Sequence, residues 1–233
     1  MGIVRMGAPE EEIIFLKQLF HINRFVETGT FKGGTSVWAS QYFKQVDTIE
    51  FSEAIYQETS QKFKHLANIN FINQDSRIAL AEIIRAATEP ILFWLDAHWC
   101  SMGSYGENDQ CPLIRELNII SSSPVSHFIL IDDARLFMAP PPLPNLIKYY
   151  PNINQIAETS NKYTLTIYED VIFMLPVNAQ EAFSIFLQKK VTQVWQEYGK
   201  EIERLDALKN MSRFSKTRSL LGSVLEIWKW KSK

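Results

Sequence analysis

The sequence has 233 residues, 46% hydrophobic and 21% charged, which is typical of one globular domain of ordinary size with a terminal extension. Its formal net charge of −2 argues against a general affinity for nucleic acid phosphates or acidic membranes. No apolar run is long enough for a secretory signal or a transmembrane helix, so we expect a cytoplasmic protein without stable membrane insertion.

The chain holds two cysteines, Cys100 and Cys111, which are too few for a disulfide framework and fit a reduced compartment. A bridge between them, closing the intervening loop, is the alternative. The final stretch, residues 216–233, is basic and contains aromatic side chains. We interpret it as a solvated terminal helix, with contact to a membrane surface as the weaker alternative.

Strand-like apolar runs alternate with helix-like segments from residue 24 to about residue 150. The runs are residues 24–30, 45–52, 69–76, 91–97 and 127–134. Several of them are continuously apolar, which is typical of strands buried on both faces in a parallel sheet. Successive strand–helix units predict an α/β, doubly wound domain with right-handed crossovers.

The pattern changes after this alternation. Residues 162–176 hold two strand-like runs around a Glu-Asp turn, which predicts an antiparallel hairpin at the end of the sheet. From Asn178 onward the apolar residues recur at helical spacing, as in a packing helix or a dimer contact. We therefore expect a domain over residues 1–177 and a C-terminal helical extension over residues 178–233.

A glycine-rich loop follows the first predicted strand. Residues 27–36 read ETGTFKGGTS, in which Gly29, Gly33 and Gly34 allow sharp turns and close approach to a ligand. The spacing fits neither the phosphate loop nor the dinucleotide fingerprint. The acidic residue at its start favours a ligand with a cation or amine near the strand end. A purely structural role for the glycines is the alternative.

Polar residues also end the second and third predicted strands. Glu50 follows the glycine loop by about twenty positions, where an acidic side chain can accept both hydroxyls of a ribose. The alternative is a carboxylate at the start of the next helix, a role open to Ser52 or Glu53 as well. Asp75 and Ser76 could bond the edge of an adenine, or Asp75 could cap the following helix.

The fourth and fifth predicted strands end in carboxylates. Asp96, Asp132 and Asp133 should converge, because the carboxyl ends of neighbouring parallel strands meet at one edge of the sheet. Three carboxylates repel one another unless a cation lies among them, and hard oxygen ligands favour Mg²⁺, Mn²⁺ or Ca²⁺. His98 follows Asp96 by two residues and could act as a general base.

Two alternatives remain open at these strand ends. A zinc site could use His98, Cys100 and Cys111, although a fourth ligand is missing. Alternatively, the pair Asp132-Asp133 could cap the segment that follows it.

These stretches together resemble the class I S-adenosylmethionine-dependent methyltransferases over roughly residues 10 to 176. The resemblance implies a mostly parallel, seven-stranded Rossmann-like sheet that ends in an antiparallel hairpin, with a C-terminal helical tail. It also implies that the glycine loop holds the methionine part of the cofactor, that Glu50 holds the ribose, and that Asp75 and Ser76 contact adenine. The implied cofactor contacts are Glu27, Thr28, Gly29, Thr30, Gly33, Gly34, Thr35, Ser36, Glu50, Phe51, Asp75, Ser76 and Asp96.

More specifically, the strand ends LFWLDAHW and ILIDDA are similar to those of the metal-dependent O-methyltransferases, which include catechol and sugar enzymes. The similarity implies Mg²⁺ held by Asp96, Asp132 and Asp133, with Asp96 and His98 as catalytic residues and His98 as the base. The expected activity is O-methylation of a hydroxyl on a sugar, glycan or small natural product.

The sequence departs from that family in two places. The loop after the fourth strand is longer and glycine-rich, and the N-terminal region is too short for a helical lid. Trp99, Tyr105 and Arg135 are candidates for the mouth of the acceptor pocket. We expect a small-molecule or glycan acceptor as partner, no nucleic acid, and a homodimer through the C-terminal helices.

Two rival functions are considered. The first is a non-catalytic protein of the same fold that serves as a binding or assembly subunit in glycan or natural-product synthesis; the retained aspartates and His98 argue against it. The second is a metal-dependent hydrolase on an α/β sheet, which Glu50 and the terminal hairpin disfavour.

Overall fold

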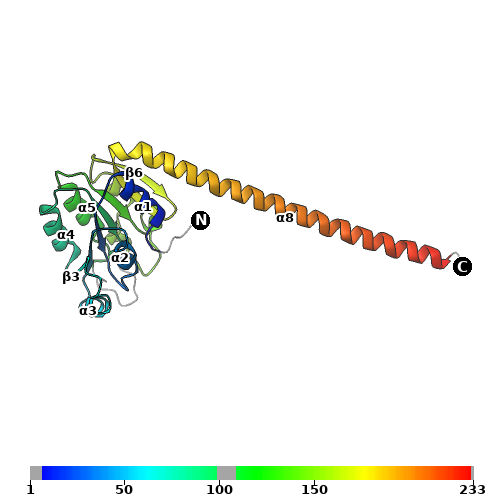
Figure 1. Ribbon diagram of the computed structural model, residues 1–233, viewed down its shortest axis with the longest axis horizontal. Coiled ribbons are helices and arrows are strands. Elements are labelled where there is room, and N and C mark those ends of the chain that lie inside the picture. Colours follow the sequence, from blue (N-terminus) through cyan, green and yellow to red (C-terminus); the bar gives the residue numbers. More distant parts are fainter. Residues whose placement is uncertain (1–6, 99–108, 232–233) are drawn as a thin grey trace. The chain divides into compact units, whose positions relative to one another are not determined.

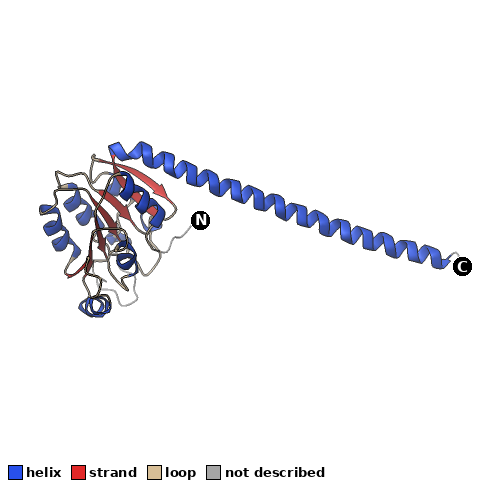
Figure 2. Cartoon of the chain, viewed as in Figure 1, coloured by secondary structure: helices blue, strands red, loops and turns tan. Residues whose placement is uncertain are grey.

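A computed structural model of the chain describes residues 7–98 and 109–231, apart from the side chains of residues 207, 208 and 210–231. The chain divides into two units, Met1–Gln180 and Glu181–Lys233. The first unit contains a seven-stranded sheet with the strand order β3-β2-β1-β4-β5-β7-β6 (Figures 1 and 2). This order confirms the predicted doubly wound α/β architecture.

The strands of the first unit occur largely where the apolar runs predict them. They are β1 (Arg24–Thr28), β2 (Gln45–Glu50), β3 (Ile69–Asn73), β4 (Ile91–Leu95), β5 (Phe128–Ile131), β6 (Tyr163–Tyr168) and β7 (Val171–Pro176). Strands β1 to β5 pair in parallel, whereas β7 runs antiparallel to both β5 and β6. The predicted terminal hairpin is therefore confirmed.

Helices cover both faces of this sheet. They are α1 (Glu10–Leu19), α2 (Gly34–Ala39), α3 (Glu53–Lys62), α4 (Ser76–Arg85), α5 (Leu113–Ser121), α6 (Arg135–Met138) and α7 (Ile153–Ala157), with short 3-10 helices at Ile147–Tyr149 and Val177–Ala179. Figure 1 shows α4 and α5 on one face and α1 and α2 on the other.

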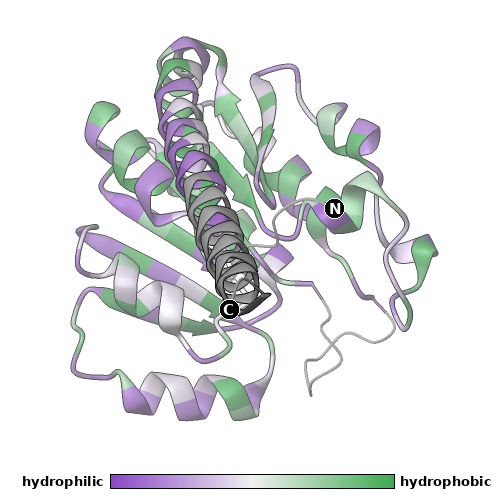
Figure 3. Cartoon of the chain, turned by 90° about the vertical axis from the view of Figure 1, so that its right-hand side faces the viewer, coloured by the Kyte–Doolittle hydropathy of each residue, from purple (hydrophilic) through white to green (hydrophobic). Residues whose placement is uncertain are grey.

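The main hydrophobic core lies between the sheet and helices α4 and α5. Phe93 and Ile129 of the central strands are fully buried against Leu80 of α4 and Leu117 of α5. Strands β4, β5 and β7 are buried along their whole length, and in Figure 3 the helices carry polar as well as hydrophobic residues. This is the pattern of a sheet buried on both faces by amphipathic helices.

The strand order reverses at β1, which lies between β2 and β4. At such a switch point the loops after two adjacent strands lead to opposite faces and leave a crevice for a ligand. Gly29, just after β1, has a φ of +88°, and a Cβ on it would lie 2.7 Å from the backbone oxygen of Asp96 after β4. The floor of the crevice therefore has no room for a side chain at Gly29.

The second unit consists of most of the helix α8 (Gln180–Lys231). Its described part carries exposed apolar side chains at heptad spacing: Trp195, Tyr198, Ile202 and Leu205. Such a stripe is typical of coiled-coil helices. The homodimer that the sequence predicts through this helix stays a prediction.

No helix in the described part of the chain combines the length and the apolar character needed to cross a membrane.

The constraint at Gly29 predicts a measurable loss of stability in Gly29→Ala. We expect the free energy of unfolding in a urea titration to fall by about 2–4 kcal/mol, because alanine is strained at this φ and its Cβ meets the Asp96 backbone. Gly34→Ala is the matched control, since a Cβ there meets nothing within 4 Å. That control should leave stability unchanged or raise it by up to about 1 kcal/mol. Equal stabilities of the two variants would contradict this account of the crevice.

Candidate active site

Glu27 lies beneath the glycine-rich loop. Its side chain is 2% exposed, and its Oε2 accepts hydrogen bonds from the hydroxyls of Ser36 and, at 2.8 Å, Thr48. Burial raises the pKa of Glu27 to about 7, and the hydroxyl hydrogen bonds limit the rise. The carboxyl thus connects β1, β2 and the start of α2, so it supports the loop from below. Its predicted contact with the cofactor stays a prediction.

Gly33 and Gly34 stand at the start of α2, between the loop and the helix. Gly33 is the N-cap residue, with a φ of +74°, and a Cβ on it would lie 2.8 Å from Thr59 of α3. This glycine therefore has a structural role. Gly34 faces open space, which leaves room for a ligand above it. Thr28 and Thr30 are buried, and the Thr30 hydroxyl is 2.7 Å from that of Thr48.

Glu50, at the end of β2, faces the glycine-rich loop. Its Oε2 accepts the backbone N–H of Phe31 at 3.0 Å, and its Oε1 accepts that of Ser52 at 2.9 Å. Glu50 therefore also serves as a carboxylate at the start of the next helix, because Ser52 is the N-cap of α3. A carboxylate has about four lone-pair sites, so it can still accept ligand hydroxyls. Phe31, whose backbone N–H bonds Glu50, and Phe51, the next residue after Glu50, are both about half exposed.

Asp75 is the N-cap of α4, the role that the sequence left open beside adenine binding. Its side chain accepts the backbone N–H of Arg77 at 2.9 Å and pairs with the Arg77 guanidinium. The hydrogen bond from Arg77 lowers the pKa of Asp75 despite partial burial. Arg77 also pairs with Asp109, next to the start of α5. The adenine contacts of Asp75 and Ser76 stay predictions.

Glu116 is a buried carboxyl that the sequence analysis did not assign. It lies in the first turn of α5 and is 1% exposed. Burial raises its pKa to about 7, and a hydrogen bond from the Ser76 hydroxyl limits the rise. The buried hydroxyl of Thr28 makes a smaller contribution in the same direction. Acidic residues are common in first helical turns, so the sequence carried no signal that this one is buried.

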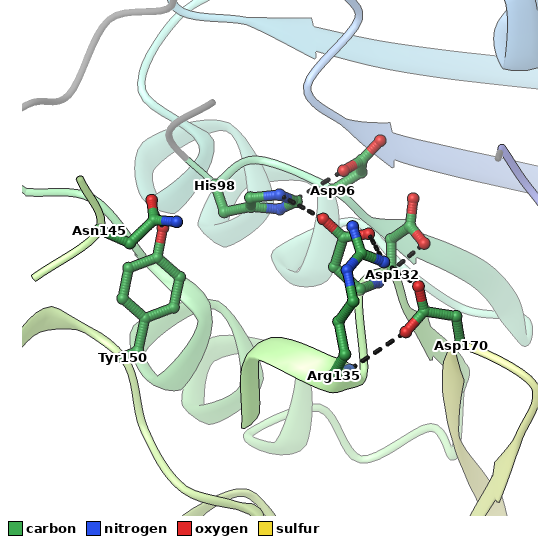
Figure 4. A network of polar contacts seen from close by, with 8 residues as sticks. Asp96, His98, Asp132, Arg135, Asn145, Tyr150 and Asp170 are labelled. Atoms are coloured by element: carbon green, nitrogen blue, oxygen red, sulfur yellow. Dashed lines mark hydrogen bonds and ion pairs between the residues drawn. The ribbon is translucent and has the colours of Figure 1, made fainter. Parts of the chain in front are cut away.

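His98 is held at the carboxyl end of β4 (Figure 4). Its Nε2 is 2.8 Å from Oδ2 of Asp133, and its Nδ1 is 3.5 Å from Oδ1 of Asp96. Oδ1 of Asp133 is 2.6 Å from Nη1 of Arg135, which also pairs with Asp170. The structure therefore brings together His98 and the predicted carboxylates Asp96 and Asp133, and adds two residues to them.

The pKa values of the two consecutive aspartates after β5 are shifted in opposite directions. Burial and the neighbouring Asp133 carboxylate raise the pKa of Asp132, whose Oδ1 accepts the Asp133 backbone N–H at 2.7 Å. Burial would also raise the pKa of Asp133, but the hydrogen bonds and charges of His98 and Arg135 outweigh it and lower that pKa. Neither aspartate side chain caps α6, which begins after Ala134 with no side-chain cap.

The predicted metal ligands do not form a metal site in this arrangement. In the part of the chain that the structure describes, no group of three or more His, Cys, Asp or Glu side chains is arranged to hold a metal ion. The oxygens of Asp133 already face His98 and Arg135, and the guanidinium supplies a positive charge beside them. The donor set of Asp96, Asp132 and Asp133 is of the kind that Mg²⁺ prefers, but with Asp133 engaged in this way it does not fit the ion.

Cavities lie at both edges of the sheet in the first unit. A small one of about 10 Å³ adjoins His98, Asp132 and Glu116 at the carboxyl ends of the strands. A larger one of about 390 Å³ lies at the opposite edge, where Arg24 and Ile91 begin their strands. Ligands of this sheet type bind at the carboxyl ends, so the position of the larger cavity argues against a catalytic role.

Several predicted features lie outside the described residues. They are the acceptor-pocket candidates Trp99 and Tyr105, and Cys100, on which the disulfide and zinc alternatives depend. Cys111 carries a free thiol, and burial raises the pKa of that thiol to about 12.

The raised pKa of Glu116 predicts the pH dependence of stability. A carboxyl whose folded pKa exceeds its unfolded value stabilises the fold at low pH and loses this contribution as the pH rises from about 4.5 to about 7. Glu116→Gln should therefore raise the free energy of unfolding by about 2–3 kcal/mol at pH 8 and by much less at pH 5. Glu89→Gln, at an exposed position, is the control for replacing a glutamate by glutamine. A pH-independent loss in Glu116→Gln would show that the folded protein requires the charged form.

The sequence matches no protein-family model and no curated protein. Solved structures do match the fold. A protein described as a caffeoyl-CoA O-methyltransferase from Staphylococcus aureus is 15% identical, with a TM-score of 0.54 over 74% of this chain and 86% of that one. The S-adenosylhomocysteine-bound methyltransferase of Podospora anserina is 15% identical, with a TM-score of 0.50 over 73% of this chain and 80% of that one.

A protein described as an rRNA methylase from Clostridium thermocellum is 8% identical, with a TM-score of 0.51 over 75% of this chain and all of that one. At these identities the likeness concerns the fold alone. With the strand order and the terminal hairpin, the comparisons show that this chain has the fold of the class I S-adenosylmethionine-dependent methyltransferases.

Proposed function

We propose that this protein is an S-adenosylmethionine-dependent methyltransferase that methylates a hydroxyl of a sugar, glycan or small natural product. The observation that carries the proposal is the imidazole of His98, held by Asp133 beside the switch point of a methyltransferase fold. A hydroxyl is a weak nucleophile until its proton is removed, so an acceptor of this kind benefits most from a positioned base.

The first part of the proposal concerns cofactor binding at the crevice between β1 and β4. Glu50 would accept the ribose hydroxyls, and the backbone of the loop after Gly29 would approach the methionine part. The exposed rings of Phe31 and Phe51 offer apolar surface near Glu50 for the adenine. When bound, the cofactor supplies a methyl group on a positively charged sulfur, and the Asp96 carboxylate at the same edge would favour that charge.

The second part concerns proton removal. In the neutral tautomer in which Nε2 of His98 donates to Asp133, the lone pair of Nδ1 lies on the side of Asp96, whose Oδ1 is 3.5 Å away. This nitrogen would accept the acceptor's hydroxyl proton, and the resulting imidazolium would be stabilised by Asp133. Because the Asp133 carboxylate is engaged by His98 and Arg135, no step of this proposal passes through the Mg²⁺ ion that the sequence resemblance implies.

Cofactor binding is tested by titration calorimetry of the full chain with S-adenosylmethionine. We expect single-site binding that weakens by about tenfold or more in Glu50→Gln, since a charged acceptor of the ribose hydroxyls is lost. Glu53→Gln removes an exposed carboxylate a few residues away and is the matched control. Thermal melts should show that both variants are folded. Absence of binding to the unmodified chain would refute the proposed function.

Metal dependence is tested separately, after an acceptor is found by screening glycosides and phenols for a mass gain of one methyl group. We expect turnover in excess EDTA to stay within about twofold of turnover in excess Mg²⁺, because the Arg135 guanidinium already pairs with the Asp133 carboxylate that would bind the ion. Loss of turnover in EDTA, restored by Mg²⁺, would instead assign the strand-end carboxylates to a metal.

A further inference from the structure

We propose that Arg135 and Asp170 are positioning residues that orient the His98 base through Asp133. The inference rests on the proposed function and adds two residues to it that the strand ends alone do not provide. Asp170 belongs to the turn between β6 and β7, whereas Arg135 begins α6, and Figure 4 shows the Arg135 side chain between Asp170 and His98.

Asp170 fastens the hairpin turn to the start of α6. It is 2% exposed, its Oδ1 accepts the backbone N–H of Arg135 at 3.1 Å, and its Oδ2 pairs with the Arg135 guanidinium. Its backbone oxygen also accepts the N–H of Ala134 at 2.8 Å. Backbone and side chain of Arg135 are thus fixed by the same carboxylate, so the guanidinium has little freedom to leave the site.

The fixed guanidinium in turn immobilises Asp133. Nη1 of Arg135 is 2.6 Å from Oδ1 of Asp133, and Nε2 of His98 is 2.8 Å from Oδ2 of the same carboxylate. A carboxylate engaged at both oxygens cannot rotate freely, so the plane of the imidazole that donates to it is set as well. Asp133 has a φ of +56°, a left-handed conformation that aspartate tolerates better than most residues and that occurs at functional sites.

Arg135 also supplies the positive charge that the cluster needs. Asp132, Asp133 and Asp170 are mostly buried, and their mutual repulsion would favour protonation or displacement without a cation. The sequence suggests Arg135 for the acceptor pocket and Asp133 for a metal ligand. The structure pairs the two with each other, so a protein side chain provides the charge at this place.

If Arg135 and Asp170 only stabilised the fold, they would make the same contacts but would not fix the orientation of the His98 ring or the hydrogen bond of its Nε2 proton. The two roles differ in the imidazole proton on Nε2. If the chain Asp170–Arg135–Asp133 positions the ring, that proton stays hydrogen-bonded and exchanges slowly with water. If the chain serves stability alone, its loss changes the melting temperature but leaves the His98 ring signal and the turnover unchanged.

The experiment combines nuclear magnetic resonance of the ¹⁵N-histidine-labelled full chain at pH 8 with methyl-transfer kinetics on the acceptor from the screen. His98→Gln identifies the Nε2 proton signal of His98 by its disappearance. The test variants are Asp170→Asn and Arg135→Gln, and Arg135→Lys retains the charge as a conservative variant. Glu169→Gln removes a carboxylate from the same turn and is the matched control.

We expect the unmodified chain and Glu169→Gln to show the protected His98 proton. Asp170→Asn and Arg135→Gln should lose this signal and should lower kcat by about tenfold or more, with the KM for S-adenosylmethionine within about twofold. Arg135→Lys should retain part of the Nε2 proton signal and part of kcat. If Asp170→Asn does not fold, the half-exposed Arg135 carries the test.

The inference is overturned if the unmodified chain shows no protected His98 proton, or if both folded test variants retain the signal and the turnover. Failure of the proposed function gives a different result, because a chain that binds no S-adenosylmethionine in calorimetry can still show the protected proton.

Discussion

The constraint on which the site depends is the burial of carboxyl groups near the carboxyl ends of the strands, because burial disfavours their charged forms. Glu27, Glu116 and Asp132 are nearly inaccessible to water, and burial raises the pKa of each of them. Each carboxyl is tolerated for a local reason: hydroxyl donors surround Glu27, the Ser76 hydroxyl bonds Glu116, and Asp132 accepts the next backbone amide. A concentration of costly groups at one edge of a sheet is characteristic of a functional site.

The terminal hairpin contributes to this edge more than its position in the sheet suggests. Its turn places Asp170 against Arg135, and the guanidinium then connects the turn to Asp133 and the imidazole of His98. The antiparallel pairing of β7 with β5 fixes that turn at the carboxyl end of β5, where Asp132 and Asp133 emerge. The feature that separates this fold from dinucleotide-binding folds thus also supports the catalytic arrangement proposed above.

Local sequence patterns predicted the sheet, the hairpin, the C-terminal helix and the edge that carries the site. Apolar runs mark strands, and the polar residues that end them must meet at one edge, so Asp96, His98 and Asp133 could be grouped without coordinates. The contact of Asp170 with Arg135 could not be predicted, because Asp170 lies 35 residues further along the chain and meets Arg135 through tertiary structure alone. The burial of Glu116 could not be predicted either, because acidic residues are common in first helical turns and its burial depends on tertiary packing.

The most direct test of the central claim is a crystal structure of the full chain with S-adenosylhomocysteine and Mg²⁺. The account predicts ribose hydroxyls on Glu50, the cofactor sulfur at the edge between Gly29 and Asp96, and Nε2 of His98 still bonded to Asp133. A cofactor bound elsewhere, or an ion held by Asp96 and Asp133 with His98 displaced, would contradict it.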